Sequence, residues 1–490
     1  MAESKREKVY FMGIAGTGMA SVAGMLQQTG VEVVGSDREI YPPMSTMLAD
    51  LKIPVLTPYK ADNLTKTSPD LVVVANSLSR GNPEVEHILK HKIPHTSFAA
   101  LLGDRFLEKK KSIVVSGTHG KTTTCSLLSF FLQELDQDPS FLIGGIPRNF
   151  TKSYQLGKGS LFVVEGDEYD TAFFDKESKF LHYRPQIVIL NNLEFDHADI
   201  FSNLEAIEDT FAKLLKLVPN PAQIIANIDD PGVSKLLNQL SIFNKVTKIS
   251  AKGLTSTGDV KLNGSLAFDE EKGLWKIPLD TDLWGQMTLS CKLGGAHNAA
   301  NIAMVIGCLS YMQQNGFLNK NCNAQELGEI LLKFKSVRRR LDHLCTSKGI
   351  QVYEDFAHHP TAVKTVIESF RISHPDKRVI VAFEPRNATS RRKIFAADYT
   401  EALKKADVSL IGACANDERI PKQERMDTKE IAANVGDESH AFNTNGEVYD
   451  WLAQHSRAGD SVIFMSCGSF SGIVKKFCSS LKTASTPKYT

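Results

Sequence analysis

A strand, a glycine turn and a helix start are predicted by residues 112–124, which read Ser-Ile-Val-Val-Ser-Gly-Thr-His-Gly-Lys-Thr-Thr-Thr. The apolar run 113–115 favours a buried strand, and a helical pattern begins near Lys121 and continues to about Gln137. In this arrangement turn N–H groups and the helix N-terminus bind phosphates, while Lys121 reaches the outer phosphates and Thr122 can ligate Mg²⁺. The candidate residues for a nucleoside triphosphate are Gly117, Thr118, His119, Gly120, Lys121, Thr122 and Thr123.

This loop departs from the usual phosphate-loop pattern, because Val115 stands where its first glycine is expected. The simpler alternative is an ordinary strand-to-helix turn with a capping threonine. Gly-Lys-Thr-Thr-Thr directly after a buried strand favours a nucleoside triphosphate site over that alternative.

Length and composition limit the classes of protein to which the chain can belong. A chain of 490 residues is too long for one core and predicts about three α/β domains. Lys and Arg number 57 against 56 Asp and Glu, so no overall field favours nucleic acid or a membrane surface. The N-terminus lacks the apolar segment of a signal peptide, no apolar run is long enough to span a membrane, and the eight cysteines form no Cys-x-x-Cys. A cytoplasmic protein with reduced thiols, without nucleic-acid binding or membrane insertion, is expected.

The first segment, residues 1–109, begins with a predicted strand, glycine loop, helix and second strand. Gly13, Gly16 and Gly18 would let a diphosphate approach the backbone, and Ser36-Asp37 follows the second strand where an acid suits a ribose hydroxyl. The glycine spacing differs from the dinucleotide fingerprint, so a tight Rossmann-like turn without a ligand is the alternative. The lysines at 109–111 are expected to be a solvated linker.

The second segment, residues 110–336, alternates strands and helices, which predicts a mostly parallel sheet. One strand leads into Glu165-Gly-Asp167-Glu168 and another into Asp196-His197. Because ligands lie outside the carboxyl ends of parallel strands, both clusters should share a rim with the phosphate loop and hold Mg²⁺. Taken separately, each cluster could equally be a helix cap or a solvated loop.

The pattern of residues 245–290 predicts a small antiparallel insertion. His297 and Asn298 lie at the start of an alanine-rich helix. These two residues could contact a base or ribose, although helix capping is the commoner role for such residues. A second linker is expected near Val337 to Asp342, and the third segment, 337–490, repeats the strand–helix alternation. Polar residues after its strands predict a second binding face, with Asp355, Arg386, Ser466, Gly468 and Gly472 as candidates.

Six motifs follow one another along almost the whole chain: Gly117-Thr-His-Gly-Lys-Thr-Thr-Thr, Glu165-Gly-Asp-Glu, Asp196-His197, Gly-Ala-His297-Asn298, Arg338-Arg-Arg340 and Asp355-Phe-Ala-His-His-Pro. Together they resemble the Mur ligase family, ATP-dependent amide-forming enzymes of peptidoglycan synthesis. The stretches Phe173-Phe-Asp-Lys176 and Phe383-Glu-Pro-Arg386 resemble its recycling branch, which joins UDP-N-acetylmuramate to the murein tripeptide L-alanyl-γ-D-glutamyl-meso-diaminopimelate. The branch that adds L-alanine is the close alternative.

The resemblance implies a Rossmann-like N-terminal domain for the UDP-sugar, a central P-loop ATPase domain and a Rossmann-like C-terminal domain that contacts the amino substrate. It further implies roles for particular residues. Lys121 would bind the outer phosphates, and Thr122, Glu165 and His197 would hold Mg²⁺. His297, Asn298 and Asp355 would border the adenosine, and Arg339 or Arg340 would reach the phosphates. Arg386, Ser466, Gly468 and Gly472 are the peptide-binding candidates.

Two further classes of protein remain as alternatives. A nucleotide-switched binding protein would release phosphate without a carboxylate substrate. A nicotinamide-dependent oxidoreductase would use the Gly13 loop, but the carboxylate and histidine clusters beside a phosphate loop argue against it.

Overall fold

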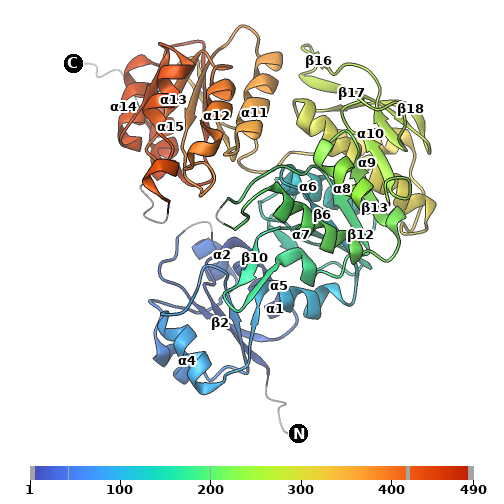
Figure 1. Cartoon of the computed structure of the whole chain (residues 1–490), viewed down its shortest axis with the longest axis vertical. Coiled ribbons are helices and arrows are strands. Elements are labelled where there is room, and N and C mark those ends of the chain that lie inside the picture. The colour runs from blue at the N-terminus through green and yellow to red at the C-terminus, as the bar shows by residue number, and fades with distance from the viewer. Residues whose placement is uncertain (1–5, 42–43, 199, 415–419, 484–490) are drawn as a thin grey trace.

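The computed structural model describes residues 6–41, 44–198, 200–414 and 420–483. Three sheet-centred units follow one another along the chain and appear blue, green to yellow, and orange to red in Figure 1. No helix among these described residues is long and apolar enough to cross a membrane.

The N-terminal unit is a five-stranded parallel sheet in the order β3-β2-β1-β4-β5. Its strand residues are apolar and buried where they face the helices, as the Rossmann-like pattern predicts. The strands are β1 Lys8–Met12, β2 Glu32–Ser36, β3 Val55–Leu56, β4 Leu71–Val74 and β5 His95–Ser97, and the helices are α1 Thr17–Gln28, α2 Met44–Asp50, α3 Ala61–Thr67, α4 Pro83–His91 and α5 Phe98–Leu102.

The middle unit contains an eleven-stranded sheet in which β6 lies between β12 and β9, parallel to both. The carboxyl ends of these three strands therefore meet at one edge. The strands are β6 Lys111–Ser116, β7 Ser140–Leu142, β8 Tyr154–Gln155, β9 Leu161–Gly166, β12 Ile187–Leu190, β13 Ile224–Asn227, β14 Thr247–Ser250, β15 Val260–Leu262, β16 Ala267–Asp269, β17 Leu274–Thr281 and β18 Gly285–Cys291. A separate hairpin pairs β10 Asp170–Ala172 with β11 Asp175–Ser178, and the helices are α6 Lys121–Glu134, α7 Leu204–Lys216, α8 Pro231–Gln239, α9 Ala296–Gln314 and α10 Ala324–Lys333.

The C-terminal unit is a six-stranded sheet in the order β19-β20-β24-β21-β22-β23, parallel except at its β19 edge. The strands are β19 Asp342–Ser347, β20 Ile350–Asp355, β21 Arg378–Phe383, β22 Val408–Ile411, β23 Ser439–Ala441 and β24 Asp460–Met465, and the helices are α11 Pro360–Ser373, α12 Ala396–Leu403, α13 Thr428–Val435, α14 Asn445–His455 and α15 Ile473–Thr483.

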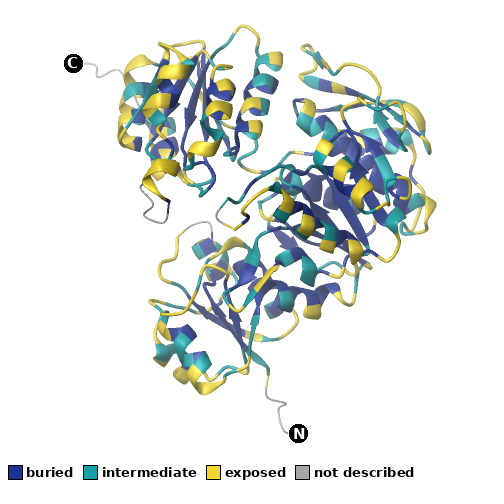
Figure 2. Ribbon diagram, in the orientation of Figure 1, coloured by how far each residue is buried: buried dark blue, intermediate teal, exposed yellow. Residues whose placement is uncertain are grey.

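The N-terminal and middle units share a hydrophobic core, whereas the C-terminal unit has separate cores. In Figure 2 the sheets are dark blue and the outward helix faces are yellow. One continuous apolar cluster runs from the N-terminal unit, with Val9 and Phe11, into the middle unit, with Phe162 and Val188. The C-terminal unit has core clusters of its own. The first two units are thus joined by shared apolar packing, and the third docks on the middle unit largely through polar side chains described below.

Two local expectations needed revision. Helix α6 ends at Glu134, short of Gln137, because Asp136 and Asp138 adopt left-handed backbone conformations (φ 57° and 41°) that end a right-handed helix. The excursion at 245–290 is antiparallel only in part, since β14 and β15 first extend the parallel sheet before β17, β16 and β18 pair antiparallel.

Candidate active site

The turn between β6 and α6 requires glycine at two positions. Gly117 and Gly120 have φ values of 126° and 84°, which favour glycine strongly. A Cβ atom on Gly120 would lie 2.4 Å from Oδ1 of Asn301, and one on Gly117 would lie 2.8 Å from the carbonyl oxygen of Asn192. The loop is therefore pressed against the segment that follows β12 and against α9.

Hydrogen bonds fix this loop to the residues after β12. The Thr118 N–H donates to the Asn192 carbonyl oxygen at 3.2 Å, and the His119 N–H donates to Asn192 Oδ1 at 2.7 Å. The Thr118 hydroxyl donates to the carbonyl oxygen of Glu194 and accepts from its N–H. Thr123 is buried in the first turn of α6. The segment after β12 therefore holds the loop between β6 and α6 in place.

Lys121, Glu168 and His197 form a continuous charged chain at the same edge. Lys121 Nζ lies 2.9 Å from Glu168 Oε2 and also donates to the Gly117 carbonyl oxygen at 2.7 Å. Nε2 of His197 lies 3.2 Å from Glu168 Oε1. Burial opposes ionisation of Glu168, but Lys121 and His197 outweigh it and hold its pKa at about 2. Burial would lower the pKa of His197, yet its hydrogen bond with Glu168 raises it.

Thr122 and Glu165 meet beside this chain. The Thr122 hydroxyl donates to Glu165 Oε2 at 3.2 Å, and the Gly144 N–H donates to Glu165 Oε1 at 2.8 Å. Burial and the neighbouring charge of Asp167 raise the pKa of Glu165 to about 7. Carboxylate and hydroxyl oxygens this close to a phosphate loop are donors that suit Mg²⁺, and an imidazole lies on the adjoining strand end. The donor set therefore fits the divalent cation that the sequence predicts.

The neighbouring arginines Arg339 and Arg340 point to different units. Nη2 of Arg340 donates to the Thr122 hydroxyl at 3.3 Å, so Arg340 reaches the phosphate loop from the linker. Arg339 donates to the carbonyl oxygens of Ser466 and Gly468 and pairs with Glu354 at 2.9 Å. The structure thus places only Arg340 of this pair beside Thr122.

His297 and Asp355 interact with residues of the linker, Arg340 and Leu341. Burial, and then the charge of Arg340, lower the pKa of His297 to about 4. Asp355 accepts hydrogen bonds from the N–H groups of Leu341 and Ala357 at 2.6 and 2.7 Å, and so anchors the end of the linker. Asn298 lies in the first turn of α9 and donates to the carbonyl oxygen of Gly294 at 2.8 Å, and no side chain caps this helix, whose N-cap is Gly295.

A cavity of about 610 Å³ lies between the N-terminal and middle units. Gly13, Gly16, Gly18 and Asp37 line one wall. Asp37 accepts from the Ala15 N–H at 2.9 Å and from the Tyr59 hydroxyl at 3.1 Å. These contacts fix the acidic side chain beside the glycine loop.

Ser36 differs from its neighbour Asp37. Its side chain is fully buried, and its hydroxyl donates to the buried carboxylate of Glu84, which also accepts from Tyr10. The structure therefore gives Ser36 an internal hydrogen-bonding role away from the cavity wall that Asp37 lines. β2 ends at Ser36, and Asp37, the first residue beyond the strand, turns toward the N–H of Ala15 in the glycine loop.

The opposite wall adds two residues that the sequence did not single out as ligands, Tyr169 and Lys179. Asp167, Tyr169 and Lys179 line it together with Glu165. Lys179 Nζ lies 3.9 Å above the Tyr169 ring and 3.5 Å from Asp167 Oδ2. Burial lowers the pKa of Lys179 despite Asp167. Lys179 lies 14 positions after Glu165 and 18 before His197 and belongs to no predicted ligand motif, so only the fold reveals its place.

The C-terminal candidates gather around a buried carboxylate. Glu384 accepts from the Ser466 hydroxyl and from Nδ2 of Asn445, and Nη1 of Arg386 lies 3.6 Å from it. A Cβ on Gly468 would lie 2.4 Å from the Arg386 side chain, so these residues are in direct contact. Gly472, with φ 78°, ends the neighbouring turn. Arg386, Ser466 and Gly468 are thus brought together on one face.

Polar contacts join the C-terminal unit to the middle unit near the phosphate loop. The Thr389 hydroxyl donates to the buried Asp196 carboxylate at 2.7 Å, and the Thr361 hydroxyl donates to Glu194 at 2.8 Å. Both acceptors belong to the segment that follows β12, which also holds the phosphate loop. This segment therefore links the third unit to the site.

Three family models match consecutive parts of the chain. They are the Mur ligase family catalytic domain at residues 8–110, the Mur ligase middle domain at 115–309 and the Mur ligase glutamate ligase domain at 339–468.

Full-length relatives support the same assignment. An Escherichia coli protein named UDP-N-acetylmuramate–L-alanyl-γ-D-glutamyl-meso-2,6-diaminoheptandioate ligase is 35% identical, over 97% of this chain and 98% of its own length. A UDP-N-acetylmuramate–L-alanine ligase from Arthrobacter is 31% identical, over 82% of this chain and 80% of its own length. The crystal structure of a murein peptide ligase from Psychrobacter arcticus superposes with a TM-score of 0.71 at 28% identity, covering 97% and 98% of the two chains. The chain belongs to the Mur ligase family, and its three α/β units are those of the Mur ligase fold.

Proposed function

We propose that this protein is an ATP-dependent, ADP-forming amide ligase. It joins the lactyl carboxylate of UDP-N-acetylmuramate to the amine of L-alanyl-γ-D-glutamyl-meso-diaminopimelate, in the recycling of peptidoglycan. The Escherichia coli relative carries this pair of substrates in its name. Such a reaction takes place in the bacterial cytoplasm, where ATP and the UDP-sugar are available. The proposed domains are 1–109 for the UDP-sugar, 110–336 for ATP and Mg²⁺, and 337–490 for the peptide.

The position of Glu165 carries the proposal. Its carboxylate accepts from Thr122 of the phosphate loop and also lines the cavity that begins at the Gly13–Gly18 loop. A phosphate-binding loop and a cavity of sugar-nucleotide size therefore meet at one acidic side chain. This is the arrangement that transfer of a phosphoryl group onto a cavity-bound carboxylate requires.

Charge dictates the first step. A free carboxylate resists attack by an amine, so one of its oxygens must first take the γ-phosphoryl group of ATP, which releases ADP and leaves an acyl phosphate. Two anions must approach each other for this transfer, and Lys121 and Arg340 stand at the loop to offset their repulsion. Mg²⁺, held by Thr122, Glu165 and His197, would supply further positive charge when bound.

The second step joins the peptide. The free amine of its L-alanine attacks the acyl carbon, and inorganic phosphate leaves. Because water competes for the same carbon, the site must be closed during this step. The C-terminal unit docks through Thr361 and Thr389, has a core of its own, and is suited to closing over the loop. Arg386, Ser466, Gly468 and Gly472 are the proposed peptide contacts, and Gly13, Gly16, Gly18 and Asp37 the proposed UDP-sugar contacts.

The nucleotide site is proposed at the phosphate loop, residues 117–123, with His297, Asn298 and Asp355 near the adenosine. Arg340 is the arginine proposed for the phosphates. Arg339 would act indirectly, because its side chain is engaged with the C-terminal unit.

The decisive experiment supplies the full chain with ATP, Mg²⁺ and UDP-N-acetylmuramate, together with either the tripeptide or L-alanine. Phosphate release and the mass of the UDP-linked product are measured. Preferential formation of the tripeptide product is expected. Preferential use of L-alanine would replace the proposed substrate by that of the Arthrobacter relative and keep the family. Phosphate release without any carboxylate substrate would instead favour a nucleotide-switched protein, and reduction of NAD would favour an oxidoreductase.

A further inference from the structure

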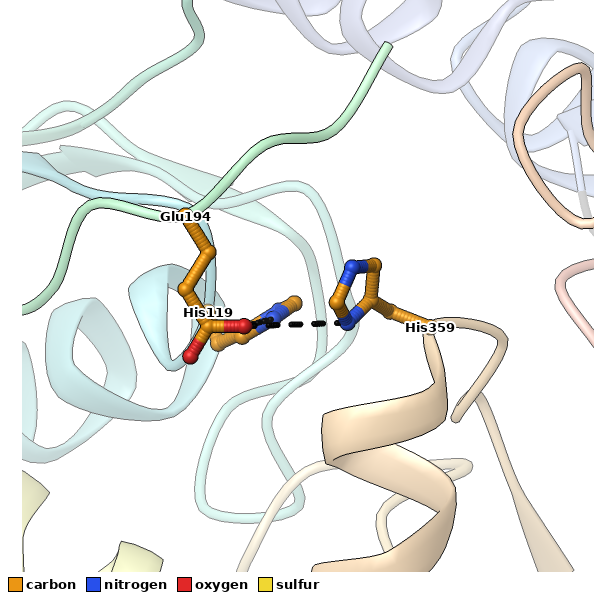
Figure 3. Close-up of side chains that lie close together, drawn as sticks. All are labelled: His119, Glu194 and His359. Carbon is orange, nitrogen blue, oxygen red and sulfur yellow. Dashed lines mark ion pairs between the residues drawn. The ribbon is translucent and has the colours of Figure 1, made fainter. Parts of the chain in front are cut away.

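A cluster of two histidines and a glutamate lies outside the residues proposed for Mg²⁺. His119 comes from the phosphate loop, Glu194 from the segment after β12, and His359 from the start of α11 in the C-terminal unit (Figure 3). Nε2 of His119 lies 3.5 Å from Glu194 Oε2, and Nδ1 of His359 lies 3.8 Å from the same oxygen. One donor atom from each side chain lies within 4.8 Å of the other two.

This spacing is close to that of a metal centre. A tetrahedral cation with ligands at about 2.0–2.1 Å separates its donor atoms by about 3.3 Å, so the two distances to Glu194 need little change. Among the described residues, Nε2 of His119 and Nε2 of His359 are buried without a hydrogen-bond partner. The His359 side chain is only 4% exposed, whereas His119 and Glu194 are 22% and 34% exposed. His359 presents Nδ1 to Glu194, and this atom also accepts a hydrogen bond from the Thr361 N–H at 3.3 Å, so a cation bound there would replace that capping bond.

The donor types select the kind of cation. Two imidazoles and one carboxylate suit zinc and similar divalent transition metals, whereas the set proposed for Mg²⁺ offers two oxygen donors and one imidazole beside the phosphates and water that this ion favours. Three protein ligands leave a fourth position for water. We propose that His119, Glu194 and His359 bind a divalent transition cation of the zinc type, which ties the phosphate loop to the C-terminal unit.

The site differs from the proposed Mg²⁺ site in its ligands and in what it connects. His359 belongs to the C-terminal unit, while His119 belongs to the loop between β6 and α6. The Thr361 hydroxyl already bonds to Glu194 across the same boundary. A bound cation would strengthen this contact between the units, and its binding can be measured without any ligase substrate.

The test uses Co²⁺ as a coloured probe, titrated into the metal-free full chain in excess Mg²⁺. We expect one equivalent to bind with a visible ligand-field band. His359→Asn and Glu194→Gln should each weaken Co²⁺ binding at least about tenfold. Asn preserves a helix-capping acceptor at position 359, and Gln preserves the acceptor for Thr361. The matched control is His374→Gln, at the other end of the same helix, which should bind Co²⁺ unchanged.

Three results would overturn the site: no visible band, Co²⁺ binding as tight as that of wild type in either variant, or displacement of Co²⁺ by Mg²⁺. Circular dichroism checks that each variant folds, and either variant alone decides the question. If the wild-type chain binds Co²⁺ but shows no ligase activity, the proposed function is wrong and the metal site stands.

Discussion

Nζ of Lys121 lies 2.9 Å from Oε2 of Glu168, a side chain that is only 3% exposed. The lysine expected to meet the phosphates is therefore paired with an internal carboxylate and with the Gly117 carbonyl oxygen. An incoming phosphate must compete with both partners. Lys121 thus serves two purposes, since it balances a buried charge and it is available to an anionic substrate.

Replacing Lys121 tests both purposes. Lys121→Met should lower turnover at least about 10³-fold, because a preorganised positive charge at the phosphates is lost. It should also lower the free energy of unfolding by about 3 kcal/mol, since Glu168 loses its main partner. Lys121→Met combined with Glu168→Gln should recover much of the stability but no turnover. Urea unfolding and phosphate release separate the effects; recovery of turnover in the double variant would contradict the proposed role of Lys121.

Gly120→Ala is expected to disrupt the phosphate loop. Its Cβ would lie 2.4 Å from Asn301 and 3.0 Å from Asn191, at a φ of 84°. Gly273→Ala is the matched control, because its φ is 62° but no atom lies within 4 Å of the added carbon. Both variants carry the backbone cost of about 1–2 kcal/mol, and only Gly120→Ala adds the clash. ATP affinity measured by calorimetry should fall in Gly120→Ala alone. An equal fall of ATP affinity in Gly273→Ala would show that backbone strain, and not the clash with Asn301, causes the effect.

Thr389→Val should loosen the docking of the C-terminal unit. The Thr389 hydroxyl donates to the buried Asp196 carboxylate, and losing a hydrogen bond to a charged group costs about 1.5–3 kcal/mol. That cost shifts the docked population about tenfold or more. Small-angle scattering should report a larger radius of gyration. Thr365→Val, whose hydroxyl bonds only within α11, should leave it unchanged; an equal radius in both variants would show that Thr389 does not govern docking.

His297 should make stability depend on pH. Burial and Arg340 lower its folded pKa to about 4, below the ordinary value of 6.5, so the unfolded chain binds more protons between these values. The stabilisation is therefore fully present above pH 6.5 and is lost as pH falls toward 4, by roughly 1 kcal/mol per pH unit. Urea midpoints of wild type and His297→Gln should converge as pH falls from 7 to 5. His343→Gln, at an exposed position, provides the control, and parallel curves for His297→Gln would refute the assignment.

Local sequence patterns correctly predicted the α/β fold and the polar clusters at the ends of the strands. Apolar runs such as residues 113–115 and 187–190 mark buried parallel strands, and parallel strands place their carboxyl ends together. That reasoning anticipated a shared edge for Lys121, Glu165 and His197. The resemblance to the Mur ligase family offered both Arg339 and Arg340, because neighbouring residues are equivalent until backbone angles aim them; Arg339 has φ 61° and turns toward Ser466.

Other distinctions and contacts had no local signal in the sequence. Ser36 and Asp37 are adjacent in sequence, yet Ser36, the last residue of β2, bonds to Glu84, and Asp37, just beyond the strand, lines the cavity. The partnership of His119 with His359 joins positions 240 residues apart, from two units with separate cores. Contacts of this kind depend on how the units dock, and no window of the sequence contains that information.

The apolar cluster that continues from Val9 to Val188 makes the first two units a single cooperative body, whereas the C-terminal sheet keeps its own interior. Heating should therefore unfold the chain in two calorimetric stages rather than three. A protease that cleaves near Arg338 would release one fragment that folds by itself and leave behind a two-sheet remnant with its cavity intact.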